Sequence, residues 1–213
     1  VDEVEARMLE ALARAASPLA IGLLLDQPRR WRAPGAASDA ARDRVLMRLI
    51  HPPLVAAVGA SNIGKSTLLN TLAGRSVSIV ADEPGTTRDH VGVMLDIGGL
   101  WVRFIDTPGV REGLDPGSDG VELEAVAEAR RIADGADLVL DCGDPTHPPL
   151  MHGAASRLRV CLRRDLGEPG WGADVRLSCR DGEGLERLVA AMRRALVPEV
   201  ALSDPGPWRF WGA

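Results

Sequence analysis

The sequence predicts an α/β protein in which a mostly parallel six-stranded sheet is covered by helices and is preceded by an N-terminal helical arm. Two observations predict this class. From Leu54 onward, short runs rich in β-branched residues alternate with longer segments of helical periodicity, which is typical of a parallel sheet with helices packed on it. Before that point, apolar residues recur at helical spacing.

Three helices are expected in the arm. Apolar residues at helical spacing over residues 4–12 predict the first. Ser17 and Pro18 offer a cap and a proline at the first helical position of the second, which stops before Pro28. The third is expected after Asp39, and it must end before the prolines at 52 and 53, because proline excludes the α conformation from the residue preceding it.

The remaining chain alternates strands and helices. Strands are expected at 55–58, 91–97, 101–105, 138–140, 160–162 and 175–177, and helices at 65–72, 121–133 and 184–196. Gly98 and Gly99 separate two of these strands by a tight turn, so that pair is expected to be an antiparallel hairpin. The elements divide the chain into a helical arm over residues 1–51, a sheet domain over 52–200 and an irregular tail over 201–213.

Composition restricts the class of function. The 213 residues carry a formal charge of −5, which argues against a dedicated nucleic-acid binder, so direct RNA binding is not expected. The arginines at 29, 30 and 32 are interpreted as a solvated surface loop. Cys142, Cys161 and Cys179 lack the spacing of a zinc site or a disulfide framework and are expected as small buried hydrophobes. The sequence has neither a membrane-length apolar run nor the layout of a signal peptide, so a cytoplasmic location is expected.

A glycine-rich segment fits the P-loop pattern and lies between a predicted strand and a predicted helix, the context that supports the motif. Its glycines let backbone N–H groups turn inward around phosphates, and the helix N-terminus adds positive potential. Lys65, the single lysine among 25 basic residues, is expected to reach the β- and γ-phosphates, and Ser66 to bind Mg²⁺. The predicted nucleotide-binding residues of this segment are Asn62, Ile63, Gly64, Lys65, Ser66 and Thr67.

A second phosphate motif, Asp-Thr-Pro-Gly, begins at Asp106, where the strand predicted at 101–105 ends. Asp106 is expected to hold Mg²⁺ through water. The amide of Gly109 is expected to sense the γ-phosphate, a close approach that a side chain would block.

Three runs, GASNIGKSTLLN, ADEPGTTRD and DTPG, together resemble the Ras-like P-loop GTPases of the MnmE/TrmE, Era and EngA group, with a spacing similar to that of MnmE. The resemblance covers about residues 54–196. It implies a Ras-like G domain that hydrolyses GTP with Mg²⁺. It also implies that Thr87 completes the Mg²⁺ shell, and that a K⁺ ion is held by Asn62, Thr86 and the main chain of Ala81 and Glu83.

The base-recognition motif departs from the NKxD pattern of that group, because the chain reads Leu162-Arg163-Arg164-Asp165. Asp165 remains to accept hydrogen bonds from guanine, whereas the missing Asn removes a partner for the other edge of the base. Arg163 can cover the base face with its planar group. Ser178 and Cys179 resemble the SAK-type loop whose backbone contacts the guanine oxygen.

The water-orienting glutamine of Ras-like enzymes is replaced by Val110. In MnmE-like proteins a glutamate at the start of the next helix activates water, and alignment places Glu122 at that position. Glu122 equally fits a capping box after Asp119, so both roles stay open. Arg88 and Arg111 could stabilise charge, although a solvated surface explains them too. The catalytic candidates are therefore Lys65, Thr87, Gly109 and Glu122.

Two functions fit these motifs. The first is a GTP-hydrolysing molecular switch that uses Mg²⁺ and K⁺, whose G domains pair face to face in the transition state and whose effector the sequence does not identify. The second is a nucleotide-binding interaction module with little or no turnover, favoured by the degenerate base motif and by the short connection between residues 144 and 158.

Overall fold

The computed structural model describes residues 2–75, 79–80, 92–107, 109, 120–149 and 156–211, with side chains except at 79, 80 and 120–125. It contains one seven-stranded sheet in the order β2-β3-β4-β1-β5-β6-β7. The strands are β1 (Leu54–Gly59), β2 (Ile79–Val80), β3 (Val93–Asp96), β4 (Trp101–Asp106), β5 (Leu138–Gly143), β6 (Arg157–Cys161) and β7 (Val175–Arg176). From β4 to β7 the neighbours are parallel, and β2, β3 and β4 pair antiparallel.

All six predicted strands are present, with ends that shift by a few residues. β5 continues three residues further than expected, to Gly143, and β6 begins three residues earlier, at Arg157. The seventh strand, β2, was not predicted, because two residues are too few to show any periodicity. The hairpin is confirmed: Gly98 and Gly99 have φ of 74° and 86°, which a two-residue turn between antiparallel strands requires.

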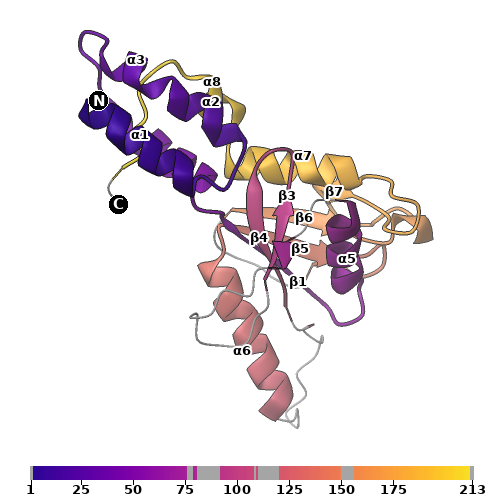
Figure 1. Ribbon diagram of the computed structural model, residues 1–213. Coiled ribbons are helices and arrows are strands. Elements are labelled where there is room, and N and C mark those ends of the chain that lie inside the picture. The colour runs from indigo at the N-terminus through magenta and orange to yellow at the C-terminus, as the bar shows by residue number, and fades with distance from the viewer. Residues whose placement is uncertain are drawn as a thin grey trace.

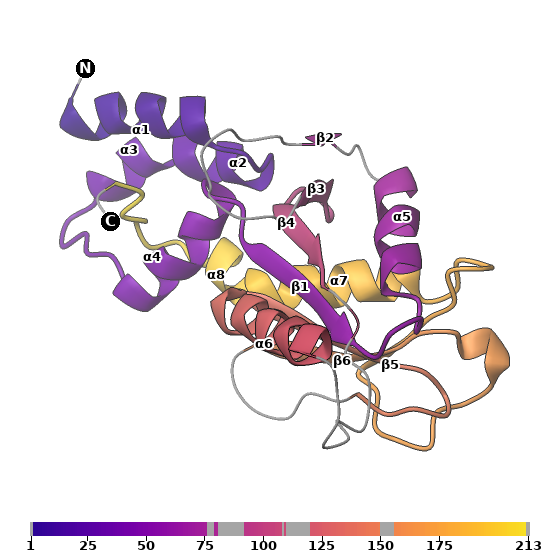
Figure 2. The ribbon, with the colours of Figure 1, turned by 90° about the horizontal axis from the view of Figure 1, so that it is seen from below.

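Helices cover the two faces of the sheet unequally. α5 (Lys65–Arg75) and α7 (Leu185–Leu196) lie on one face, and α6 (Gly120–Gly135) lies on the other (Figures 1 and 2). Alternate residues of β1 serve the two sides, because successive strand side chains point to opposite faces: Val55 and Ala57 join the large core, whereas Ala56 and Val58 join the small core under α6.

Arginines occupy the same face as α6 on the outer strands. Leu158 and Val160 pack into the large core, so Arg157 and Arg159 of β6 point to the opposite side. They form ion pairs with Asp141 (3.3 Å) and Asp174 (3.6 Å). In their described parts, the connections that flank β6 contain no α-helix. A polar face needs no helix to bury it, which explains how the short connection after β5 is accommodated.

The arm contains α1 (Glu3–Arg14), α2 (Leu19–Leu25), α3 (Gln27–Trp31), α4 (Ala40–Leu46) and a 3₁₀ turn, η1 (Met47–Leu49). Asp39 caps α4 as expected, accepting from the amides of Ala41 and Arg42. The expectation for Ser17 is wrong. α2 has no side-chain cap, and the Ser17 hydroxyl accepts instead from the Trp101 amide at 3.0 Å, which ties the arm to β4.

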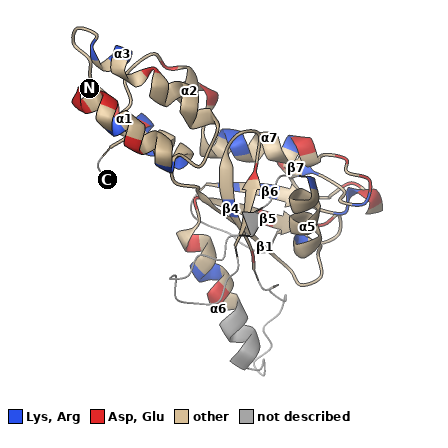
Figure 3. Ribbon diagram, viewed as in Figure 1, with Lys and Arg blue, Asp and Glu red and all other residues tan. Residues whose placement is uncertain are grey.

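Pro28 begins a helix as well as ending one. It lies in the first turn of α3, where its missing N–H would have no intrahelical partner. Arg29 and Arg30 of the arginine cluster therefore lie on a helix rather than a loop, and Arg32 is the C-cap of that helix. Arg29 and Arg30 pair with Asp26, and Arg32 pairs with Asp2 and Glu5, so the positive charges of the arm are interleaved with acidic ones (Figure 3). None of the helices in the described part of the chain is both long and apolar enough to cross a membrane.

The end of the chain returns to the arm. Residues 199–203 form α8 (Glu199–Ser203), so the irregular segment begins only at Asp204, later than the sequence suggested. The proline and glycine residues at 205–207 indicate irregular structure, so the short helix before them was not predicted. Figure 1 shows α8 and the following segment beside the N-terminal helices. Trp208 and Phe210 are fully buried there, and the Trp208 amide donates to buried Gln27.

Arg42 holds this returning segment by its backbone. The buried Arg42 side chain, 7% exposed, donates to the carbonyls of Ala201 (2.9 Å), Asp204 (3.0 Å), Gly206 (3.1 Å) and Pro207 (3.1 Å). Main-chain recognition of this kind is insensitive to the side chains of the bound segment. It makes the arm and residues 199–211 one packed unit.

We predict that Arg42→Ala destabilises the arm by about 1–3 kcal/mol or more, because buried carbonyls lose charged donors. Urea unfolding would measure the loss, and limited proteolysis should cut first near residue 204. Arg44→Ala, which removes an exposed charge from the same helix, is the matched control and should change neither result. Equal stability of the two variants would contradict the role assigned to Arg42.

Candidate functional site

The P-loop connects β1 to α5 at the carboxyl end of the central strand, as predicted. Gly59 has φ of 151°, and a Cβ at this position would lie 2.4 Å from the carbonyl oxygen of Cys142 on β5. Asn62 and Gly64 also have positive φ, 60° and 112°. Only glycine fits at position 59, because the backbone of β5 lies so close. The positive φ angles at 62 and 64 turn the chain sharply and give the loop its curled form.

Lys65 lies within this loop. Its side chain is buried, and Nζ donates to the carbonyls of Gly59 (3.1 Å) and Ala60 (2.8 Å). Burial lowers the pKa of Lys65, and the nearby Asp106 carboxylate offsets part of that shift. An ammonium with two neutral carbonyl partners and little water around it favours an anion as its third partner.

Ser66 and Asp106 meet beside Lys65. Ser66 Oγ donates to Asp106 Oδ2 at 2.5 Å, across the gap between α5 and the end of β4. Asp106 Oδ1 is buried without a hydrogen-bond partner among the described residues. A hydroxyl and a carboxylate with a free oxygen are hard oxygen ligands of the type that Mg²⁺ uses together with water. The residues present therefore fit the predicted magnesium position.

Gly109 lies against the P-loop. A Cβ on Gly109 would be 2.4 Å from Ser61 Cα, and the Ser61 hydroxyl donates to the Gly109 carbonyl at 3.0 Å. Thr107 fixes the approach, because its buried hydroxyl donates to the Ala57 carbonyl at 2.8 Å. The sequence predicted Gly109 but missed Ser61 and Thr107, whose partners lie about fifty residues away in the chain.

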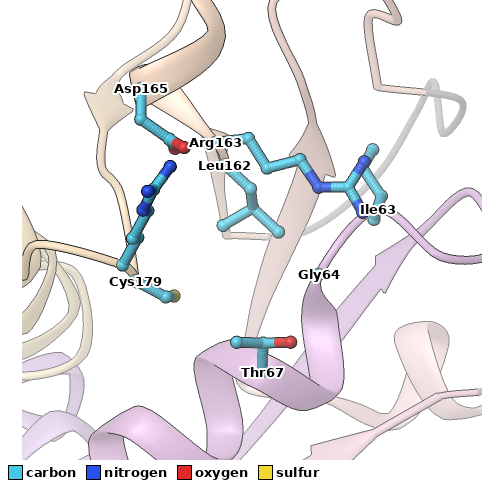
Figure 4. Close-up of a pocket in the computed structure, with 8 residues that line it drawn as sticks. Ile63, Gly64, Thr67, Leu162, Arg163, Asp165 and Cys179 are labelled. Carbon is cyan, nitrogen blue, oxygen red and sulfur yellow. The ribbon is translucent and has the colours of Figure 1, made fainter.

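A cavity opens beside the P-loop, toward the carboxyl ends of β6 and β7 (Figure 4). It brings together residues from three segments distant in sequence, 63–67, 162–165 and 179–180. Asp165 and Cys179, both predicted, stand on one side, and Ile63 and Gly64 stand on the other. Its lining consists of Ile63, Gly64, Thr67, Leu162, Arg163, Asp165, Cys179 and Arg180.

Arg163 adopts an unusual backbone conformation at the mouth of this cavity. Its φ of 57° and ψ of 41° are left-handed, which costs a non-glycine residue about 1–2 kcal/mol. Its guanidinium donates to the carbonyl of Asn62 and lies 3.9 Å from the Asp144 carboxylate. Asp144 is itself fixed by the amides of Thr146 and His147, each at 2.8 Å. Arg163 therefore binds the P-loop, a role that the sequence did not predict.

The loop after β7 forms the far wall. Ser178 is buried, its amide donates to the Glu183 carbonyl, and its carbonyl accepts from the Gly182 amide, each at 3.0 Å. Because the Ser178 amide is engaged, Cys179, the next residue, is better placed to present its backbone to a ligand. Burial raises the pKa of the Cys179 thiol, which keeps it uncharged.

Several predicted site residues lie outside the described part of the chain: Ala81, Glu83, Thr86, Thr87, Arg88, Val110, Arg111 and Asp119. Glu122 lies in the first turn of α6, whose side chains there are not described. The catalytic and cation-binding roles of these residues remain predictions.

Comparison with known proteins agrees with the motifs. Residues 54–161 match the family model described as 50S ribosome-binding GTPase. The chain is 38% identical over 207 residues to the tRNA modification GTPase MnmE of Acidiphilium cryptum, which covers 96% of this chain and 43% of that protein. It is 37% identical to the MnmE of Thermus thermophilus, in an alignment that covers 92% of this chain and 47% of that protein. The chain thus spans less than half the length of these relatives.

Solved structures of Era share the fold. Era in complex with MgGDPNP and part of 16S ribosomal RNA superposes with a TM-score of 0.52 at 28% identity, covering 68% of this chain and 58% of that one. An Aquifex aeolicus Era variant bound to GDP.AlF4⁻ superposes with a TM-score of 0.50 at 26% identity, covering 68% of this chain and 56% of that one.

We predict that Lys65→Ala and Ser66→Ala each weaken phosphate-dependent nucleotide binding at least tenfold, because a charged hydrogen bond contributes about 1.5–3 kcal/mol. Titration of a fluorescent nucleoside diphosphate with Mg²⁺ present would measure it. Arg187→Ala, which removes an exposed charge from α7, is the control. Unchanged dissociation constants for Lys65→Ala would contradict the phosphate-binding role.

Proposed function

This chain belongs to the 50S ribosome-binding GTPase family, and we propose on that premise that it binds GTP with Mg²⁺ and hydrolyses it to GDP and phosphate, acting as a molecular switch. The observation that carries the proposal is the convergence of Lys65, Ser66 and Asp106 at the carboxyl end of β1. A phosphate chain that enters the P-loop would meet the one buried ammonium and the one free carboxylate oxygen of the described site.

Different residues of this chain would bind the phosphates, the Mg²⁺ ion and the γ-phosphate oxygen atoms during hydrolysis. The P-loop amides and Lys65 would bind the β- and γ-phosphates and stabilise the charge that spreads over them. Ser66, Asp106 and Thr87 would hold Mg²⁺, which neutralises the same charge when bound. The Era complex with MgGDPNP supports this assignment by likeness of fold and sequence. Gly109 would meet the γ-phosphate with its amide, since its approach to Ser61 leaves no room for a side chain.

Activation of the attacking water falls to residues outside the described side chains. We propose Glu122 for this role, because it lies at the start of α6 and follows the segment in which Val110 replaces the glutamine. K⁺, held by Asn62, Thr86 and the main chain of Ala81 and Glu83, would supply the positive charge that an arginine finger gives other enzymes. Closure of that site would accompany pairing of two G domains.

The second candidate, a nucleotide-binding module with little turnover, is favoured by one observation. The base motif has Leu162 where asparagine is expected, and its arginine is bound to the P-loop. Both candidates share nucleotide binding and differ in turnover. The relatives named for tRNA modification are more than twice as long as this chain, so we propose nucleotide chemistry alone for the chain.

Phosphate release separates the two candidates. With GTP, Mg²⁺ and K⁺, the chain should release phosphate in repeated turnovers, and Lys65→Ala should not. Tight binding of GTP without phosphate release would establish the second candidate. Failure to bind either GTP or GDP would overturn both.

We predict that the chain prefers guanine to adenine nucleotides, and that Asp165→Asn shifts this preference toward xanthine nucleotides by about tenfold or more. The carboxylate accepts from the N1–H and 2-amino groups of guanine, whereas an amide replaces one acceptor oxygen by a donor suited to the 2-oxo group of xanthine. Competition between GDP, XDP and ADP against a fluorescent GDP would measure it. Equal competition by ADP in the unmodified protein would contradict guanine recognition.

We predict that hydrolysis is faster in K⁺ than in Na⁺ and that the difference depends on the Asn62 side chain. Because Asn62 has φ of 60°, Asn62→Ala also strains the backbone, whereas Asn62→Gly removes the amide without that strain. Both variants should lose the K⁺ response, measured as the ratio of phosphate release in the two salts. GDP with aluminium fluoride should promote dimers in K⁺ but not in Na⁺. A K⁺ response that persists in Asn62→Gly would contradict the mechanism.

A further inference from the structure

Leu162 forms an apolar wall in the base cavity. It follows β6, its side chain is 1% exposed, and its amide is engaged by the Gly143 carbonyl at 2.8 Å. Leu162 Cδ1 lies 3.8 Å from the place that a Cβ on Gly64 would occupy, so the leucine reaches the P-loop. Buried Ile63 continues this apolar wall (Figure 4).

The attachment of the base to the sugar fixes which edge meets this wall. A purine is joined to its ribose through N9 on the five-membered ring, so that ring lies nearest to the phosphates in the P-loop. N1 and the 2-amino group lie on the six-membered ring, so in a bound nucleotide they would face away from the P-loop, toward Asp165. N7 belongs to the five-membered ring and would then lie on the side of Gly64 and Leu162, which line the cavity.

Resting on the proposed binding of guanine nucleotides, we propose that this pocket recognises guanine without a hydrogen bond to N7, and that it therefore accepts nucleotides of 7-deazaguanine as readily as those of guanine. Leu162 is the residue that determines this specificity. Asp165 supplies the discrimination between guanine and other bases through the opposite edge. The pocket therefore forms hydrogen bonds with the N1 edge of the base and only packs against the N7 edge.

The chemistry of N7 gives the direction of the effect. N7 is a hydrogen-bond acceptor in water, and an acceptor placed against an apolar wall loses water without gaining a partner. The 7-deaza base has a C–H group at this position and loses nothing there. A pocket with an asparagine donor would show the opposite preference.

Arg163 connects the segment after β6 to the P-loop. Its guanidinium joins the Asn62 carbonyl to the Asp144 carboxylate, and its left-handed backbone turns the chain from Leu162 toward Asp165. Arg163 is a positioning residue. It acts on Asp165 and Leu162 together, so it does not distinguish the two bases.

The proposal is tested by competition of GDP, 7-deaza-GDP and IDP against a fluorescent GDP with Mg²⁺. We expect 7-deaza-GDP to bind within about threefold of GDP or more tightly, whereas IDP, which lacks the 2-amino group, should bind about tenfold more weakly. A 7-deaza-GDP that binds more than about tenfold more weakly than GDP would overturn the proposal. Absence of GDP binding would instead overturn the proposed function.

Three variants provide matched controls. Leu162→Asn should restore a preference for GDP over 7-deaza-GDP of about fivefold or more, because it returns a donor to the wall. Leu162→Ala enlarges the pocket but keeps it apolar, so the ratio of the two affinities should stay near that of the unmodified protein. Arg163→Gly should weaken both ligands by the same factor while leaving φ at 163 unstrained. A changed ratio in Leu162→Ala or Arg163→Gly would contradict the roles assigned.

Discussion

The ammonium group of Lys65 is held inside the P-loop by the carbonyls of Gly59 and Ala60, and the rest of the site is arranged around this buried charge. A buried charge is tolerated only with partners, so the loop must keep its carbonyls turned inward. That curl requires the close packing of Gly59 on β5 and the positive φ at Asn62 and Gly64. The same strand ends place Asp106 next to Ser66, so one packing arrangement positions both the buried ammonium and the Ser66–Asp106 pair.

Sequence reasoning predicted what depends on local pattern. The six strands, the Gly98-Gly99 hairpin, the cap at Asp39 and the P-loop residues each follow from neighbours within a few positions, and each is present. It failed where a partner lies far along the chain. Ser17 looked like a cap but accepts from Trp101, and the hydrogen bond from Arg163 to Asn62 was not predicted. Side chains with several donors or acceptors satisfy whichever partner the tertiary fold supplies, and a linear pattern does not record that choice.

The arm is joined to the sheet domain at two separated points, which limits how the two parts can move. Ser17 and Leu19 bind the β3–β4 hairpin, through the Trp101 amide and the Gly99 carbonyl. Arg48 donates to the Leu196 carbonyl at the end of α7 and to Asp137 at the start of β5. The hairpin leads directly through β4 to Asp106, so any displacement of that strand on nucleotide exchange would reach the arm through hydrogen bonds rather than through a flexible linker.

Replacing an asparagine by Leu162 transfers free energy from ligand recognition to the fold. A fully buried leucine contributes about 1.5–3 kcal/mol by burial, whereas an asparagine at the same place would need all its hydrogen-bonding groups satisfied whether or not nucleotide is bound. The gain in stability is present with or without nucleotide, and in the proposed guanine site the loss would be confined to one edge of the base. Because Asp165 is exposed, its carboxylate is solvated in the empty pocket, so the role proposed for it would impose no desolvation penalty on the unliganded fold. Discrimination at the Asp165 edge can therefore persist after the other edge has become apolar, which makes the departure from the family motif compatible with guanine specificity.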